Sequence, residues 1–299
     1  MPDIIVAVPN SESIAESLGK KGASNGITFY NGRTGSGNLV VLAPSDISSK
    51  YYGLAESLAL ADAIILDTKN PDALFGEVVA AAELLGKTLL LTPDSDVSKL
   101  LGNGVNYKVI DAQRIRDELP AVVPARPQES PRVVLDRAFS VKGVGDVALG
   151  VIISGKVKVH DVLMHSSGRE VTVRSLQAQD VDIKEAEAGT RIGINMKGID
   201  SDSIKKGDIL SLSRVPYADS LNAEIKFSRF SKEKAEKMRC SLVYAFSVSE
   251  AEVDEQPDGS YNISLKRQTP ISVGDRFILI GERMPRMFAV GTVRSVMTK

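Results

Sequence analysis

Phosphate binding is the first chemistry to consider, because the chain begins with a short apolar stretch that predicts a buried strand followed by a helix. A phosphate loop at such a junction reads Gly-x-x-x-x-Gly-Lys-Ser/Thr, and its backbone N–H groups and lysine hold the phosphates. Here residues 9–14 read Pro-Asn-Ser-Glu-Ser-Ile, with no glycine and no lysine. Pro9 lacks an N–H donor, and Glu12 would face a phosphate with a like charge. The lysines of residues 19–22, Gly-Lys-Lys-Gly, follow the predicted helix, where we expect a helix end and a loop.

Acid–base and metal chemistry have few candidate residues in this chain. The two histidines, His160 and His165, fall in one predicted hairpin, and we interpret them as surface or turn residues. The single thiol, Cys240, cannot form an internal disulfide or a cysteine-rich metal site. Asp46 and Asp67 lie near predicted strand ends, where we expect them to cap the following helices. The sequence therefore predicts no catalytic residue and no metal site.

The elements that would position such residues fall into three segments. In residues 1–125, short apolar stretches alternate with helix-like stretches, which predicts an α/β domain with a mainly parallel sheet covered on both faces. Four prolines between residues 119 and 131 mark a linker. Beyond it, Val- and Ile-rich strands separated by Gly, Asp and Ser turns predict two antiparallel β-barrels, at residues 126–214 and 215–299.

Composition and charge limit the classes of function. No apolar run reaches the roughly 18 residues of a membrane span, and no secretory signal precedes the first strand, so we expect a cytoplasmic protein. Residues 1–125 carry a net charge of −5, and each barrel segment carries +2. This mild basicity permits contact with RNA and does not require it, because nucleic-acid-binding domains are usually far more basic. We expect neither a membrane nor DNA as a partner.

The second segment carries motifs of one protein family. Residues 138–155 read Ala-Phe-Ser-Val-Lys-Gly-Val-Gly-Asp-Val-Ala-Leu-Gly-Val-Ile-Ile-Ser-Gly. Glu-Val-Thr-Val-Arg-Ser-Leu-Gln, Glu-Ala-Glu-Ala-Gly-Thr-Arg-Ile-Gly-Ile and Lys-Lys-Gly-Asp-Ile-Leu follow at residues 170–177, 185–194 and 205–210. In order and spacing this segment resembles the β-barrel that follows the G domain in elongation factor Tu, and it is most similar to the selenocysteine-specific elongation factor and its archaeal relatives. Residues 271–277 and 287–293 resemble, more weakly, parts of that family's third domain.

The front segment resembles the G domain of that family in outline and departs from it at the nucleotide motifs. Where the family has Asp-x-x-Gly, residues 42–45 read Leu-Ala-Pro-Ser. The guanine motif Asn-Lys-x-Asp is replaced by Thr-Pro-Asp-Ser-Asp at residues 92–96, whereas Gly-Ile-Thr is retained at residues 26–28. The family binds GTP and Mg²⁺ at these motifs, so the resemblance marks Thr28 and Asp96 as remaining nucleotide-binding residues. Because the phosphate loop is missing, we expect them to be relics and expect no cofactor.

The resemblance implies a translation-elongation-factor-like protein with a degenerate GTPase-like α/β domain followed by two barrels. In the family, the second barrel helps to hold the aminoacylated end of tRNA, and the third contacts its stem. We therefore predict binding to tRNA, the ribosome or another translation factor without GTP hydrolysis, so the chain is not expected to be an enzyme. Two alternatives stay open: an atypical GTPase with a remodelled nucleotide site, and a protein-interaction scaffold.

Overall fold

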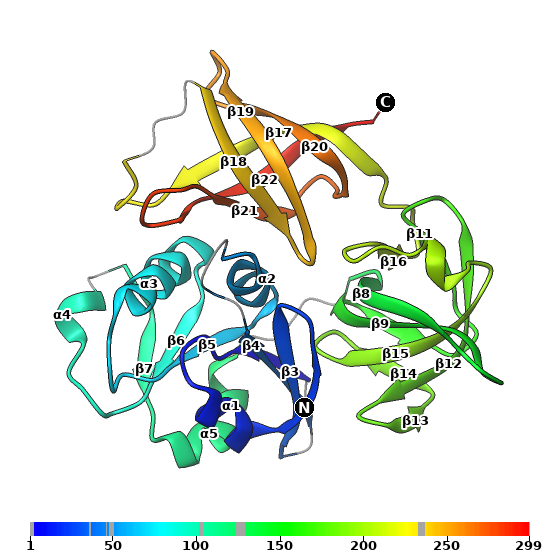
Figure 1. Cartoon of the computed structure of the whole chain (residues 1–299), viewed down its shortest axis with the longest axis horizontal. Helices are drawn as coiled ribbons and strands as arrows, with labels where there is room; N and C mark the ends of the chain where they lie inside the picture. Colours follow the sequence, from blue (N-terminus) through cyan, green and yellow to red (C-terminus); the bar gives the residue numbers. More distant parts are fainter. Residues whose placement is uncertain are drawn as a thin grey trace.

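The structure is an α/β domain followed by two β-barrels, and the three units meet around a common centre (Figure 1). We call them the front domain, barrel 2 and barrel 3. They confirm the predicted fold class. The computed structural model describes residues 3–35, 37–45, 47, 51–101, 104–123, 129–232 and 237–298. The first predicted domain boundary, at residues 125/126, lies outside the described residues, and both boundaries stay predictions.

The front domain is built on a seven-stranded sheet in the order β2-β3-β4-β1-β5-β6-β7. Strands β4, β1, β5, β6 and β7 run parallel, and β2 and β3 extend the sheet as an antiparallel edge. The central strands are apolar throughout because helices cover both of their faces. The strands are Ile4–Ala7 (β1), Lys20–Ser24 (β2), Ile27–Thr34 (β3), Gly37–Pro44 (β4), Ala63–Leu66 (β5), Thr88–Leu91 (β6) and Tyr107–Val109 (β7).

Two pairs of helices sandwich this sheet. Helices α2 (Tyr52–Leu60) and α3 (Ala73–Leu85) pack on one face, and α1 (Glu12–Leu18) and α5 (Ile115–Val122) pack on the other. The remaining helical turns are α4 and η1, at Ser98–Leu101 and Ala112–Arg114. Asp72 caps α3 by accepting a hydrogen bond from the Phe75 N–H at 3.0 Å. Among the described residues, no helix is long and apolar enough to cross a membrane.

The predicted loop after the first helix is a strand instead. Lys20–Ser24 forms β2 and pairs with β3, so residues 19–22 are not a helix end followed by a loop. The sequence does not reveal this strand because Lys20, Lys21 and Ser24 are exposed at a sheet edge, where backbone pairing alone defines the strand. Strand β3 was also missed, although its residues 27–30 are buried.

Barrel 2 is a seven-stranded sheet in the order β11-β16-β8-β9-β15-β12-β13, closed by pairing between β11 and β12. A two-stranded sheet of β10 and β14 lies beside it. Strands are present at the five segments where the sequence pattern predicts them, residues 132–140, 147–153, 161–164, 170–177 and 190–197, whereas four three-residue strands are too short to read from sequence. The strands are Arg132–Val141 (β8), Gly145–Ser154 (β9), Lys156–Lys158 (β10), Val162–His165 (β11), Glu170–Ala178 (β12), Val181–Ile183 (β13), Glu185–Glu187 (β14), Arg191–Lys197 (β15) and Ile209–Ser211 (β16).

Barrel 3 is a closed antiparallel barrel in the order β17-β20-β19-β18-β21-β22. The sequence pattern predicts a strand at residues 239–247, which corresponds to β18, and misses β19, which follows after a tight turn at Ala245 with a positive φ of 49°. The strands are Tyr217–Phe227 (β17), Lys237–Tyr244 (β18), Ser247–Glu255 (β19), Tyr261–Pro270 (β20), Arg276–Ile280 (β21) and Met287–Met297 (β22).

Candidate functional site

A cleft of about 840 Å³ opens at the carboxyl ends of β1 and β5, between the β1–α1 and β5–α3 loops. In an open α/β sheet ligands bind at such a place, because the connections on its two sides leave the sheet in opposite directions. Thr28 lines the cleft and is buried, with its hydroxyl 2.9 Å from Ser24 Oγ. The structure therefore places one of the two predicted nucleotide residues in the cleft, and its role in binding stays a prediction.

Asp96, the second predicted nucleotide residue, is not among the described residues that line this cleft. Its carboxylate is exposed and accepts a hydrogen bond from the Ser98 N–H at 3.0 Å, at the beginning of α4. The hydrogen bonds from Ser98 lower the pKa of Asp96. The geometry is that of a helix-capping carboxylate, so the structure does not bring Asp96 together with Thr28.

The polar side chains of the cleft are largely paired with one another. Lys21 Nζ lies 2.7 Å from Glu12 Oε1, and the Tyr30 hydroxyl donates to the same oxygen at 3.3 Å. The hydrogen bond from Lys21 lowers the pKa of Glu12, so this carboxylate is anionic in the first turn of α1. Opposite it, the Asn10 amide bridges the β1 and β5 loops: it donates to Asp67 O at 2.8 Å and accepts from Asp67 N at 3.0 Å.

These residues do not fit GTP and Mg²⁺, the groups that a GTPase-like domain implies. A triphosphate at the end of β1 needs several free backbone N–H groups and a lysine. Pro9 supplies no N–H, Glu12 would repel the phosphates, and Lys21 is already paired with Glu12. Within the described residues, no group of three or more His, Cys, Asp or Glu side chains is placed to hold a metal ion.

A second candidate site lies on barrel 2, on the outward surface of three neighbouring strands. Along β15, Ile192 and Ile194 point into the barrel core, so Arg191, Gly193 and Asn195 point outward. Strand pairing aligns Gly193 with Leu149 of β9 and Leu149 with Arg137 of β8. We call this surface the arginine face and define it by Arg137, Leu149, Arg191, Gly193 and Asn195.

A β-bulge in β8 places a buried carboxylate among these side chains. The register of β8 against β9 shifts between Leu135 and Arg137, which leaves Asp136 as the extra residue. Asp136 Oδ2 lies 3.3 Å from Arg137 Nε and 3.5 Å from Arg191 Nη2. Burial lowers the pKa of the Arg191 guanidinium, and Asp136 counteracts this effect. The two arginines and the single carboxylate together therefore carry a net charge of +1.

The arginine face carries buried polar atoms that lack hydrogen bonds. Among the described residues, Arg137 Nη2, Arg191 Nε and Nη2 and Asn195 Oδ1 make no hydrogen bond, although Arg191 Nη2 lies within ion-pair distance of Asp136. Buried polar groups are normally satisfied, and leaving a charged donor unpaired costs about 1.5–3 kcal/mol or more. Arg137 and Arg191 therefore present donors that a ligand with acceptor groups would satisfy, whereas Asn195 Oδ1 is an acceptor and needs a donor.

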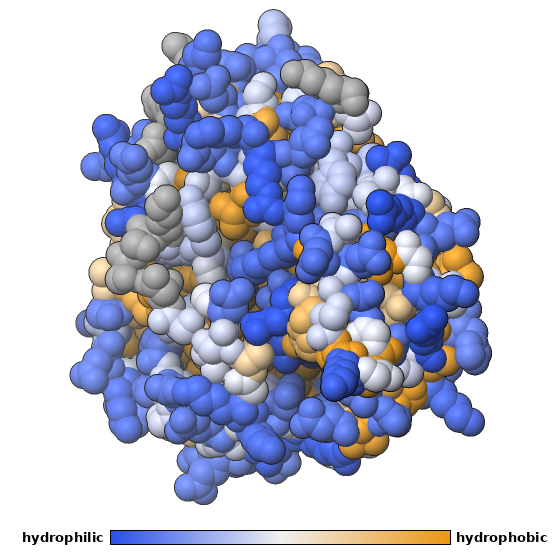
Figure 2. Space-filling model, turned by 45° about the vertical axis from the view of Figure 1, so that its right-hand side comes forward, coloured by the Kyte–Doolittle hydropathy of each residue, from blue (hydrophilic) through white to orange (hydrophobic). Residues whose placement is uncertain are grey.

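The surroundings of the arginine face combine apolar and polar surface. Arg191 lies against the front domain, with its guanidinium carbon 3.9 Å from the centre of the Phe29 ring. At the other end, the side chains of Phe139 and Val144 are 41% and 48% exposed at the β8–β9 hairpin. With the barrel 2 side turned forward, apolar patches interrupt the mainly polar surface (Figure 2). A flat strand surface with an exposed aromatic ring and cations suits stacking and anion binding together.

An ion pair joins barrel 2 to the front domain near this site. Lys206 Nζ donates to both carboxylate oxygens of Glu56, at 2.8 and 2.7 Å. Glu56 lies on α2 and is almost fully buried, and burial raises its pKa from 4.5 to about 7, against the attraction of Lys206. The nearby Asp136 carboxylate raises it further.

Glu56 is expected to make the stability of the protein depend on pH near neutrality. A raised carboxyl pKa means that the folded state binds the proton more tightly, so this contribution is complete below about pH 4.5 and is lost as pH rises toward about 7. In the unmodified protein, we expect Glu56 to make the free energy of unfolding fall by up to about 3 kcal/mol between about pH 5 and about pH 8, as measured by urea unfolding. In Glu56→Gln this decrease is expected to be absent. The exposed Glu16→Gln is the matched control, and parallel pH curves for Glu56→Gln and the unmodified protein would contradict the assignment.

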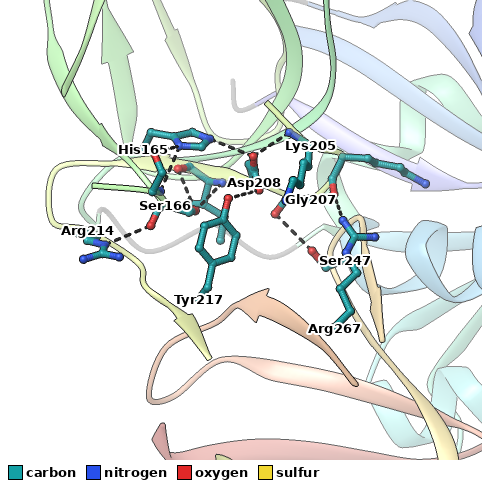
Figure 3. A network of polar contacts seen from close by, with 12 residues as sticks. His165, Ser166, Lys205, Gly207, Asp208, Arg214, Tyr217, Ser247 and Arg267 are labelled. Carbon is teal, nitrogen blue, oxygen red and sulfur yellow. Dashed lines mark hydrogen bonds and ion pairs between the residues drawn. The ribbon is translucent and has the colours of Figure 1, made fainter. Parts of the chain in front are cut away.

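A further polar cluster joins barrel 2 to barrel 3, and it contains a histidine that was predicted to lie at the surface (Figure 3). His165 is fully buried, so that interpretation is wrong for this residue. Its Nδ1 accepts from the Ser167 N–H at 3.1 Å, which leaves the proton on Nε2 to be donated to Asp208 Oδ2 at 3.0 Å. Tyr217 at the start of barrel 3 donates to the other Asp208 oxygen at 2.6 Å.

These three units, an α/β domain followed by two antiparallel barrels, have the architecture of a translation elongation factor. The sequence agrees in the middle unit, where residues 145–211 match elongation factor Tu domain 2. The chain is therefore an elongation-factor-Tu-like protein in its fold and in its second domain.

The chain is similar to individual elongation factors of more than one kind, including elongation factor 1-alpha of Metallosphaera sedula, to which it is 33% identical over 96 residues, 31% of this chain and 22% of that protein. The chain is 30% identical over 148 residues to the selenocysteine-specific elongation factor of Haemophilus influenzae, covering 46% of this chain and 24% of that protein. The structure of translation elongation factor SelB from Methanococcus maripaludis has a TM-score of 0.80 at 18% identity, covering 99% of this chain and 80% of SelB. An uncharacterized protein of Methanocaldococcus jannaschii is 28% identical over 294 residues, covering 94% of this chain and 96% of that protein.

The residues of the arginine face were not predicted as a site. Arg191 belongs to the motif at residues 185–194 that carries the family resemblance, and Asp136 and Arg137 directly precede the motif at residues 138–155. Their positions within or directly beside the family motifs are a sequence signal that points to this surface. Their unsatisfied hydrogen-bonding atoms could be recognised only from the structure.

Proposed function

We propose that the protein binds the aminoacylated end of tRNA through the arginine face and does so without hydrolysing GTP. The observation that carries this proposal is the set of unpaired buried donors on Arg137 and Arg191 beside Asp136. A tRNA end supplies phosphate and ester oxygens as acceptors and a terminal base that stacks on apolar surface. The similarity of barrel 2 to elongation factor Tu domain 2 supports the same class of ligand.

The direct test is a filter-binding titration with aminoacyl-tRNA, with deacylated tRNA as the comparison. We expect saturable binding that weakens as salt rises, because phosphate contacts release counterions. Tighter binding of the aminoacylated form would show that the protein recognises the acyl group. Absence of saturable binding to both RNAs, and to ribosomes in a parallel co-sedimentation series, would refute the proposal.

The second candidate is an atypical GTP-binding factor, favoured by the volume of the front cleft and by Thr28 on its wall. Because the cleft residues do not fit a triphosphate, we expect calorimetry with Mg–GTP or Mg–GDP at tens of micromolar protein to give no binding heat. A measurable heat that disappears in Thr28→Val would favour the second candidate over the first. Glu12→Lys reverses the repelling charge at the first turn of α1 and should gain affinity for phosphate if repulsion by Glu12 is what limits binding.

A further inference from the structure

The seam between the front domain and barrel 3 is a continuous apolar core. Leu54 and Leu58 of α2 and Val78 and Leu85 of α3 belong to the same buried cluster as side chains of barrel 3. The barrel 3 members are Val243, Ile278, Ile280, Met287 and Val290. Interfaces between independent domains are usually more polar, so this seam resembles the interior of one domain.

Buried polar contacts fix the orientation of this seam. Glu77 on α3 is 2% exposed and accepts hydrogen bonds from the N–H groups of Arg286 and Met287, at 2.9 and 2.7 Å. The Tyr52 hydroxyl lies 2.8 Å from Ser241 Oγ on β18. Separating the two units would exchange these hydrogen bonds for hydrogen bonds to water, so they fix the orientation of the seam and the buried apolar surface supplies most of its stability.

The seam between barrel 2 and barrel 3 is held by Asp208. This carboxylate accepts hydrogen bonds from His165, from Tyr217 and from the Lys205 N–H, the last at 2.7 Å (Figure 3). At the start of β8, Arg132 reaches across to Asp275 of barrel 3 at 2.5 Å and to the Tyr244 hydroxyl at 3.1 Å.

The third seam joins the front domain to barrel 2 and completes the ring of contacts. Phe29 of β3 packs edge-on against Phe246 of barrel 3, with ring centres 6.2 Å apart. The guanidinium of Arg191 of barrel 2 lies over the face of the Phe29 ring. The Lys206–Glu56 ion pair lies on the same seam. Each of the three units is thus bound to both others through buried groups.

We infer that the front domain, barrel 2 and barrel 3 form one fixed body, so that the arginine face is presented constitutively and is not switched by a nucleotide. A ligand shifts a conformational equilibrium only by its difference in affinity for the two states. The cleft that would have to supply this difference does not fit Mg–GTP, and opening the seams would expose apolar surface and break the hydrogen bonds that cross them. The consequence for the arginine face rests on the proposed function, whereas the fixed arrangement is tested without RNA.

Distances between spin labels test the fixed arrangement in the full chain. We would replace Cys240 with serine and introduce cysteines in pairs at Val109, Val181 and Val273, which lie in the front domain, barrel 2 and barrel 3 and are 54%, 55% and 63% exposed. Pulsed electron double resonance is expected to give one narrow distance distribution for every pair, unchanged by Mg–GTP or Mg–GDP. A second population, or a distance that moves with nucleotide, would overturn the inference.

Unfolding of the same labelled proteins gives an independent measurement. Because buried contacts join each unit to both others, labels in all three units are expected to become mobile at one urea concentration. Loss of order in the front domain while the barrels stay folded would overturn the inference as well. Neither measurement involves RNA, so failure of the proposed function and failure of the fixed arrangement are distinguishable.

Discussion

We expect the Asp208→Ala substitution to lower the free energy of unfolding by about 3–5 kcal/mol. Asp208 is 2% exposed, and its carboxylate is the shared acceptor for His165, Tyr217 and the Lys205 N–H. Burial alone would raise the pKa of Asp208, but these hydrogen bonds outweigh it and hold the pKa below its ordinary value. Removing the carboxylate leaves three donors without this acceptor and loosens barrel 2 from barrel 3.

Urea unfolding at neutral pH measures this effect. Tyr217→Phe removes one donor together with its hydrogen bond, so it is expected to cost less, about 1–2 kcal/mol. Asp202→Ala, at an exposed aspartate in the η2 turn (Ser201–Ser203), is the matched control and is expected to change stability by less than about 0.5 kcal/mol. If Asp208→Ala cost no more than Asp202→Ala, the assignment of Asp208 as the anchor of this seam would be wrong.

The class of fold is readable from the sequence because it depends on local periodicity. Apolar strands that alternate with helices predict the parallel part of the front sheet, and regularly spaced Val- and Ile-rich strands predict the barrels. Strand β2 is not readable in this way, since Lys20–Ser24 has no apolar alternation and exists only by pairing with β3. Strand β19 was missed for a different reason: its residues alternate between buried and exposed, but no glycine, proline or asparagine marks the turn at Ala245 that separates it from β18.

The candidate site depends on strand register and long-range pairing, which no local pattern contains. His165 is buried because Asp208, 43 residues away, provides an acceptor inside the barrel junction. The arginine face arises because pairing of β8, β9 and β15 brings Arg137 and Arg191 to one surface, and a bulge turns Asp136 toward them. By contrast, the loss of phosphate chemistry was readable, because Pro9 and Glu12 exclude a phosphate loop by their chemical type alone.

The second large effect is expected on RNA binding at the arginine face. Arg137 is the better residue to change, because its side chain is 32% exposed, whereas Arg191 is 11% exposed and packs against Phe29. Arg137→Gln retains much of the chain length and a weaker donor but removes the charge. A hydrogen bond to a charged group contributes about 1.5–3 kcal/mol, so aminoacyl-tRNA affinity is expected to fall roughly 10- to 100-fold.

A control variant must distinguish binding at the arginine face from general electrostatic attraction between the protein and RNA. Arg114→Gln removes the same charge from an exposed position of the front domain, where the side chain is 73% exposed, and is expected to leave RNA affinity within about twofold. Salt titrations of both variants separate the two cases, because removing a phosphate-binding charge at Arg137 lowers the slope of log affinity against log salt by about one. Equal decreases in affinity for Arg114→Gln and Arg137→Gln would assign binding to net charge and would remove the arginine face as the RNA site.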